Sequence, residues 1–110
     1  MRTDLVLLGV VLGAGLAATA FAQNPAARGE AVYAEQKCGV CHSIGDKGNK
    51  KGPFDGIGTR LSEADIRAWI TDAKGMTAKT KATRKPEMKA YTLSKDDVDG
   101  LVAYLSSLKK

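Results

Sequence analysis

The chain has 110 residues and a formal net charge of +5, with only two cysteines and one histidine. This length is enough for one small domain and leaves little room for a second. The cysteines and histidine cannot complete a structural zinc site, because such sites take four ligands. A domain this small buries little surface, so we expect it to depend on a staple for stability.

The first 22 residues have the pattern of a secretory signal peptide. Arg2 gives the positive start, residues 5–16 are an unbroken run of Leu, Val, Gly and Ala, and residues 20–22 form an A-x-A cleavage site. We therefore predict a signal at residues 1–22 and one domain at residues 23–110. An uncleaved membrane anchor is the alternative, since the apolar run is almost long enough to span a bilayer. The Gly- and Ala-rich second half favours cleavage, with no membrane insertion afterwards.

The sequence next predicts a helix from about residue 25 to residue 37. Pro25 is tolerated in a first helical turn, and Gly29 and Tyr33 share a helix face because they are four residues apart. A glycine inside a helix costs about 1 kcal/mol relative to alanine. A close contact with another helix would justify Gly29, and a tolerated glycine near the first turn is the alternative. The local sequence does not decide between them.

Both cysteines and the histidine lie in one pentapeptide, Cys38-Gly39-Val40-Cys41-His42. The C-x-x-C-H pattern is the signature of covalent c-type haem attachment. Two thiols three positions apart lie on one face of a helical turn, where they can add to the two haem vinyl groups. The histidine that follows is a common axial ligand of haem iron.

Other interpretations of the two cysteines are less consistent with the surrounding sequence. A thioredoxin-like pair needs a preceding strand in a βαβ unit, whereas a helical stretch precedes this motif. A plain disulfide would close a tiny loop and leave His42 without a role. We therefore favour haem attachment, and we expect the haem-free chain to be poorly folded because a porphyrin would complete its apolar core.

A loop and a second helix are predicted to follow the motif. Residues 43–59 contain five glycines and one proline, so we expect them to form a loop around the group that His42 binds. Ser62 is a good N-cap residue for the next helix, with Asp65 at the capping-box position. The apolar face of this helix would consist of Ile66, Trp69 and Ile70.

Residues 74–89 are polar and basic with little periodicity, and we predict a long loop there. They contain Met76 and Met88, and Pro86 breaks any helix around it. Ser94 then predicts the N-cap of a last helix. Its apolar residues follow the 3.6-residue rhythm, at Val98, Leu101, Val102, Leu105 and Leu108.

In this order, the residues make the chain resemble a soluble, monohaem, bacterial class I c-type cytochrome over nearly all of residues 23–110. The segments that carry the resemblance are Gly29–Tyr33, the C-x-x-C-H motif at 38–42, Gly52-Pro53, Lys85-Pro86-Glu87-Met88 with Tyr91, and Leu101–Leu105. The resemblance implies an all-α, small cytochrome c fold with three to four helices and long loops wrapped around one covalently bound haem.

The resemblance also implies roles for the matching residues. Cys38 and Cys41 would carry the thioether bonds to haem c, and His42 and Met88 would be the axial ligands of the iron. Pro53 would present its carbonyl group to the other ring nitrogen of His42, which would orient the imidazole.

Two further residues and one departure concern the haem environment. Arg60 and Trp69 would reach the haem propionates. The family usually has a proline directly after the ligand methionine, whereas Lys89 follows Met88 here. This departure leaves Met76 as an alternative ligand, although the spacing from Met88 to the last helix favours Met88. Met76 would then be a packing residue.

The whole charge excess of residues 23–110 lies in Lys74–Lys89, because the charges elsewhere cancel. This segment leads into Met88, so we expect it near the haem edge, where it would attract redox partners with an acidic docking surface. A solvated loop that serves only solubility is the alternative. Nucleic-acid binding is disfavoured, since no aromatic residue interrupts the basic run.

Together these features predict a periplasmic electron carrier that transfers one electron through a His/Met-ligated haem c and is not itself an enzyme. The sequence contains no catalytic triad, paired carboxylate site or Gly-rich phosphate loop. One alternative is a five-coordinate haem c domain that binds a small gas or acts catalytically. Another is the electron-transfer subunit of a dehydrogenase or oxidase complex.

Overall fold

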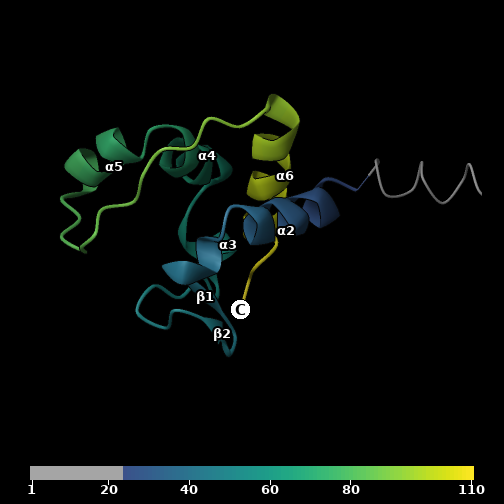
Figure 1. The fold of residues 1–110 in the computed structure, drawn as a ribbon, viewed down its shortest axis with the longest axis horizontal. Coiled ribbons are helices and arrows are strands. Elements are labelled where there is room, and N and C mark those ends of the chain that lie inside the picture. The colour runs from purple at the N-terminus through teal and green to yellow at the C-terminus, as the bar shows by residue number, and fades with distance from the viewer. Residues whose placement is uncertain (1–23) are drawn as a thin grey trace, which may run out of the picture.

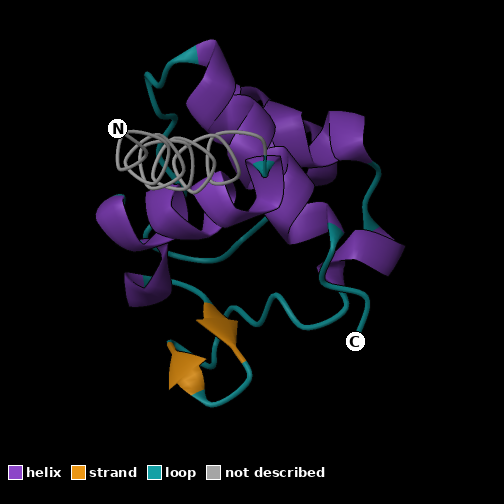
Figure 2. Ribbon diagram, turned by 90° about the vertical axis from the view of Figure 1, so that its right-hand side faces the viewer, coloured by secondary structure: helices purple, strands orange, loops and turns teal. Residues whose placement is uncertain are grey.

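The structure, a computed structural model, describes residues 24–110, so the predicted signal peptide lies outside the described residues. Its elements are α2 (Pro25–Glu35), the 3-10 helix η1 (Cys38–Val40), β1 (Ser43–Ile44), β2 (Lys47–Gly48), α3 (Ile57–Arg60), α4 (Glu63–Thr71), α5 (Ala73–Thr80) and α6 (Lys95–Ser106) (Figure 1). Within residues 24–110 the only sheet is the antiparallel β1–β2 hairpin, which lies below the helices in Figure 2. The expectation of an all-α fold is confirmed. None of the described helices is both long and apolar enough to cross a bilayer.

Helix α2 begins where the sequence predicted and ends two residues earlier. The side chain of Asn24 accepts a hydrogen bond from the backbone N–H of Ala27 at 3.2 Å, and Pro25 occupies the first turn. Such a cap satisfies one of the free N–H groups at the start of a helix. After the helix, Lys37 adopts the left-handed conformation, with φ of 57°, and turns the chain into the cysteine motif.

Gly29 lies at a close crossing of α2 over α6. A Cβ atom on Gly29 would overlap the backbone carbonyl of Gly100, and one turn further on the rings of Tyr33 and Tyr104 meet edge to face, with centroids 5.9 Å apart. The glycine is therefore required by the helix contact, and it is not simply a tolerated residue near the first turn. Its absent side chain allows the two backbones to approach each other.

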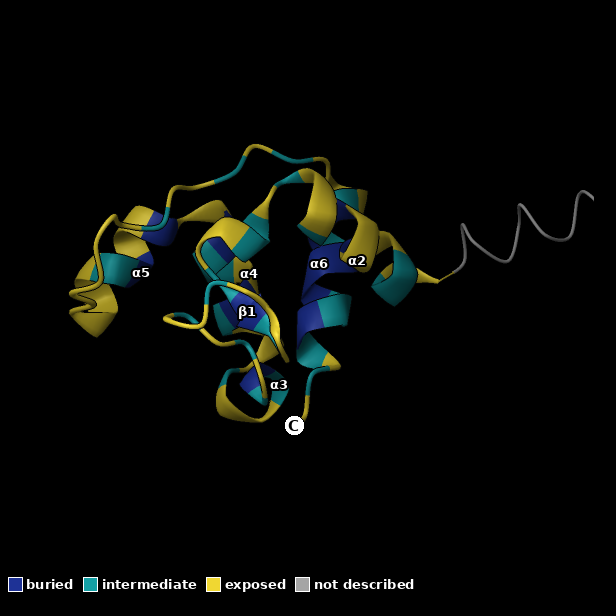
Figure 3. Ribbon diagram, turned by 60° about the horizontal axis from the view of Figure 1, so that its bottom comes forward, coloured by how far each residue is buried: buried dark blue, intermediate teal, exposed yellow. Residues whose placement is uncertain are grey.

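The core fills the space between α2, α4 and α6. Figure 3 shows the buried stripe along α6. The buried residues of the core come from four helices. They are Val32, Ile57, Ile66, Ile70, Val98, Leu101, Val102 and Leu105. The predicted apolar positions of α4 and α6 therefore meet in this core, as their 3.6-residue spacing requires. The exceptions are Trp69, which is not in the core, and Leu108, which packs against it from beyond the end of α6.

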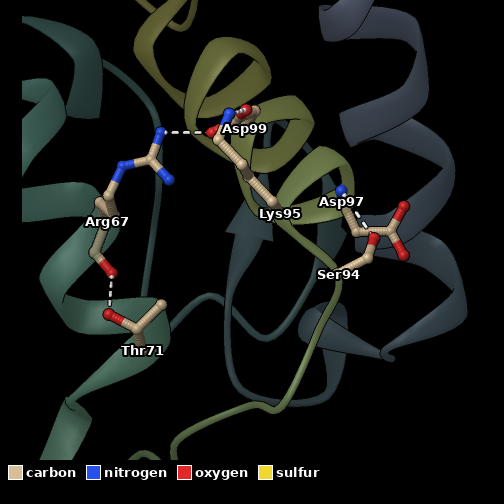
Figure 4. A network of polar contacts seen from close by, with 6 residues as sticks. All are labelled: Arg67, Thr71, Ser94, Lys95, Asp97 and Asp99. Carbon is tan, nitrogen blue, oxygen red and sulfur yellow. Dashed lines mark hydrogen bonds and ion pairs between the residues drawn. The ribbon is translucent and has the colours of Figure 1, made fainter.

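Polar contacts surround the start of α6 (Figure 4). Ser94 accepts a hydrogen bond from the backbone N–H of Asp97 at 3.1 Å, which confirms the predicted N-cap. Asp99 pairs with Arg67 of α4 at 2.7 Å and with Lys95 at 2.8 Å. These ion pairs are largely exposed and contribute little stability individually. Of the two pairs, Arg67–Asp99 joins α4 to α6, whereas Lys95 and Asp99 both belong to α6.

The prediction of one long loop at residues 74–89 is wrong for its first half, where α5 forms. The carboxylate of Asp72 caps α5 by accepting a hydrogen bond from the backbone N–H of Gly75 at 3.2 Å. Ala73 and Met76 are the buried residues of this helix. Two buried positions are too few to produce a helical periodicity in the sequence. The helix is instead stabilised by its cap and by packing against α4. Residues 81–94 contain no helix, in line with the presence of Pro86.

Candidate functional site

A cavity of about 710 Å³ opens within the hydrophobic core. Core residues from three helices form its apolar wall, and they are Ile57, Ile66, Ile70, Leu101 and Leu105. Residues from the 82–91 segment line it as well. Protein interiors are normally close-packed. A hollow of this size among core residues therefore indicates a fold built around a bound group of cofactor size.

The cysteine motif forms one side of this cavity. The backbone N–H groups of Cys41 and His42 both donate to the carbonyl oxygen of Cys38, at 3.2 and 3.0 Å, and this tight turn brings all three side chains to the cavity. Both thiols are free, so the motif does not form a disulfide. Burial raises the pKa of the Cys38 thiol, which keeps it in the neutral form.

The ring of His42 is held in a fixed orientation by two neighbours. Its Nδ1 lies 3.1 Å from the carbonyl oxygen of Gly52. Because a carbonyl can only accept, Nδ1 carries the proton and Nε2 keeps the lone pair that a metal requires. The ring of Phe54 stacks on the imidazole, with centroids 3.9 Å apart and an angle of 17° between the planes. Burial lowers the pKa of His42, and the charge of Arg84 lowers it further, so the neutral ring is favoured.

The carbonyl group that contacts His42 belongs to Gly52 and not to Pro53, which corrects the expectation from the sequence. The carbonyl of Gly52 also accepts a hydrogen bond from the backbone N–H of Ser43 at 3.1 Å, which turns it toward the motif. Successive carbonyl groups of an extended segment point to opposite sides. The carbonyl of Pro53 consequently faces away from His42 and accepts a hydrogen bond from Arg60 at 3.4 Å.

The two methionines of the described chain lie in different environments. Met88 is half-buried and lines the same cavity as His42 and the two thiols. Met76 is buried on α5 and is not among the residues that line this cavity. Of the two side chains that the sequence offered as iron ligands, the fold brings Met88 to the site.

The structure places the remaining expected site residues at the cavity and adds others. Arg60 and Trp69 both line it, Arg60 from the end of α3 and Trp69 from α4. Phe54 and Arg84 were not predicted from the sequence as residues of the site. Phe54 directly follows Gly52-Pro53, so its place beside a motif was a usable signal. No local pattern distinguishes Arg84 from the other basic residues of its segment.

The donor groups at the cavity suit a covalently attached haem. Two thiols, an imidazole with a free Nε2 and a thioether are the groups that a c-type haem uses. Within residues 24–110, no three His, Cys, Asp or Glu side chains cluster as a metal site of their own. The iron would therefore be held within the porphyrin and by axial ligands from the chain.

Comparisons with known proteins agree with this arrangement. A family model described as cytochrome c matches residues 26–109. Cytochrome c oxidase subunit 2 of Alkalihalophilus pseudofirmus is 31% identical over 91 residues, which cover 74% of this chain and 25% of that protein. This chain therefore spans about a quarter of the length of that relative, and no solved structure matches. Because the family model covers most of the chain, including the motif and the cavity, the chain belongs to the cytochrome c family and carries covalently bound haem c.

Proposed function

We propose that this chain is a periplasmic one-electron carrier whose haem iron is ligated by His42 and Met88. Cys38 and Cys41 would carry the two thioether bonds. The observation that supports this proposal most directly is the position of Met88, which lines the cavity together with the C-x-x-C-H residues although it lies far from them in the sequence. Met76, the competing thioether, is buried in α5 outside that cavity.

The contacts of the ligands suit electron transfer without catalysis. The carbonyl of Gly52 and the ring of Phe54 limit rotation of the His42 imidazole. A thioether on the other axial position favours ferrous iron and raises the potential. One-electron exchange between the ferrous and ferric states is the chemistry that haem supplies when it is bound. With both axial positions filled by side chains, no site remains for a substrate.

The charge of the cavity rim supports docking with an acidic partner. All six basic residues of the 74–89 segment are exposed, and they are Lys74, Lys79, Lys81, Arg84, Lys85 and Lys89. Two of them, Arg84 and Lys89, line the cavity. Opposite charge on a partner would accelerate encounter, and the rate would fall with rising ionic strength.

The oxidase relative favours a second candidate, in which this chain is the electron-transfer part of a larger oxidase or dehydrogenase complex. The mechanism at the haem would be the same, and only the permanence of the partner would differ. Native purification distinguishes the two. A carrier elutes at the mass of one small domain, whereas a dedicated subunit elutes with its complex at moderate salt.

Absorption spectra of the exported, haem-loaded protein test the proposed ligation. We expect a low-spin spectrum with the near-infrared band of sulfur bound to ferric iron, unchanged when carbon monoxide is added to the reduced protein. Met88→Ala should lose the band and Met76→Ala should keep it. A high-spin wild type that binds carbon monoxide at once would refute the carrier and favour a gas-binding or catalytic haem domain.

The periplasmic location needs its own measurement. The intact mass of haem protein from the periplasmic fraction should correspond to a chain that starts at Gln23. A haem protein recovered only from membranes, with residues 1–22 still attached, would contradict this location and favour the anchor.

A further inference from the structure

The segment that carries Met88 has few backbone hydrogen bonds that could hold it in place. It is fixed at its ends by two backbone hydrogen bonds, from Ala82 N–H to Thr77 at 3.1 Å and from Tyr91 N–H to Ile70 at 3.0 Å. Between these ends, the backbone of residues 83–90 makes no hydrogen bond with any other described residue. A segment held only at its ends opens easily.

Arg84 is the side chain of this segment that reaches the other side of the cavity. Its Nη1 lies so close to Gly52 that a Cβ atom on Gly52 would overlap it. The same Cβ position is 3.0 Å from Nδ1 of His42, so the guanidinium group lies beside the pair of groups that orients the imidazole. Because Gly52 has no side chain, the guanidinium group of Arg84 can occupy this position. Arg84 thus brings the Met88 segment into contact with the His42 side.

We infer that Arg84 is a positioning residue that fastens the Met88 segment to the His42 side of the site and so keeps the thioether within reach of the iron. This inference rests on the proposed ligation by His42 and Met88. An arginine suits the role because its charge is permanent and its planar group can contact several backbone atoms at once. Once haem is bound, its positive charge beside His42 would also favour the ferrous state.

Three variants distinguish the contact that Arg84 makes with the His42 side from the effect of its positive charge. Arg84→Gln removes both the contact and the charge, and Arg84→Lys keeps the charge but loses the planar group. Lys81→Gln removes one exposed charge from the residue just before the segment, which does not line the cavity. The readouts are the rate at which imidazole displaces the sulfur ligand from ferric protein, followed by loss of the near-infrared band, and the midpoint potential.

We expect Arg84→Gln to accelerate displacement by at least roughly tenfold, as loss of a charged contact implies. It should lower the equilibrium constant for reduction by about threefold, as removal of one nearby charge implies. Arg84→Lys should keep the wild-type potential and accelerate displacement of the sulfur ligand less. In Lys81→Gln, imidazole should displace the sulfur ligand at the wild-type rate.

Wild-type displacement rates in Arg84→Gln would overturn the inference even if the potential falls, because loss of charge alone explains a lower potential. If Arg84→Gln does not fold, Arg84→Lys decides, and a wild-type rate there overturns the inference too. An equal acceleration in Lys81→Gln would also refute it, since any lost charge would then suffice. A wild type without the near-infrared band would instead refute the proposed ligation, so the two failures are distinguishable.

Discussion

Gly29→Ala tests whether the crossing of α2 over α6 limits the stability of the fold. The new Cβ would overlap the carbonyl group of Gly100 and would lie 2.7 Å from Cβ of Tyr104. The first obstacle is backbone, which cannot rotate away as the end of a long side chain can. The two helices must therefore move apart along their main contact.

The expected magnitude follows from two opposing effects. Alanine stabilises a helix interior by about 1 kcal/mol relative to glycine. Overpacking of a well-packed contact costs about 1–3 kcal/mol, and a backbone obstacle lies at the upper end of that range. We therefore expect a net loss of about 2 kcal/mol in the free energy of unfolding. For a domain of this size, that corresponds to a decrease of roughly 10 °C in Tm.

Thermal unfolding of the oxidised, haem-loaded protein, followed by far-ultraviolet circular dichroism, measures this difference. Gly75→Ala is the comparison variant, because its Cβ meets the carboxylate of Asp72, an exposed side chain that can move at the cost of its cap bond to Gly75 N–H. We expect that variant to stay within about 1 kcal/mol of the wild type. If Gly29→Ala unfolds at the temperature of the wild type or above it, the close crossing does not constrain the fold and the reasoning is refuted.

Three further variants address a cap, a buried hydroxyl and a buried thioether. Ser94→Ala removes the acceptor for Asp97 N–H and should lower the free energy of unfolding by about 1 kcal/mol, measured by denaturant titration. Burial raises the pKa of Tyr33 to about 12 from its ordinary value of 10.0. Its contribution to stability is therefore complete below pH 10 and is lost as the pH rises toward 12. Tyr33→Phe should flatten that loss in denaturant titrations at successive pH values, and it should not destabilise the protein at neutral pH, since the buried hydroxyl has no partner among the described residues. Met76→Leu conserves volume, so it should keep the near-infrared band and change the free energy of unfolding by less than about 1.5 kcal/mol.

Features that depend on a few neighbouring residues could be predicted from the sequence. Ser62 and Ser94 marked the starts of α4 and α6, since each side chain caps the N–H three residues further on. The five residues of the C-x-x-C-H motif indicated the haem site because chemistry fixes their spacing. Whether Gly29 marks a close helix contact or is a tolerated glycine could be decided only from the structure. The backbone that leaves no room for a side chain at Gly29 belongs to Gly100, which is remote in the sequence.

The errors arose where distant contacts decide the structure. Helix α5 has only Ala73 and Met76 buried, so its pattern could not be distinguished from that of a polar loop. The partner of His42 is Gly52 because a bridge from Ser43 to the residues around Pro53 sets the direction of the carbonyl groups. Neither feature follows from residue type or spacing alone.

The two sides of the haem cavity differ in how firmly they hold the two proposed ligands. On the His42 side, backbone hydrogen bonds around Gly52 and the stacked ring of Phe54 fix the imidazole. On the Met88 side, residues 83–90 lack such backbone bonds to other described residues. Rearrangement at the iron should therefore begin on the Met88 side.

The residue after Met88 increases the difference in rigidity between the Met88 side and the His42 side. The family usually places a proline there, and a proline would reduce the number of conformations open to the free segment. Here Lys89 occupies the position, and its ammonium group lies 5.2 Å from the centroid of the Tyr91 ring, a contact of modest strength. We therefore expect side chains to hold the Met88 segment, and Arg84 is one that reaches the His42 side. Met88→Ala and Arg84→Gln should therefore change the same exchange process, the first by removing the proposed ligand and the second by releasing its segment.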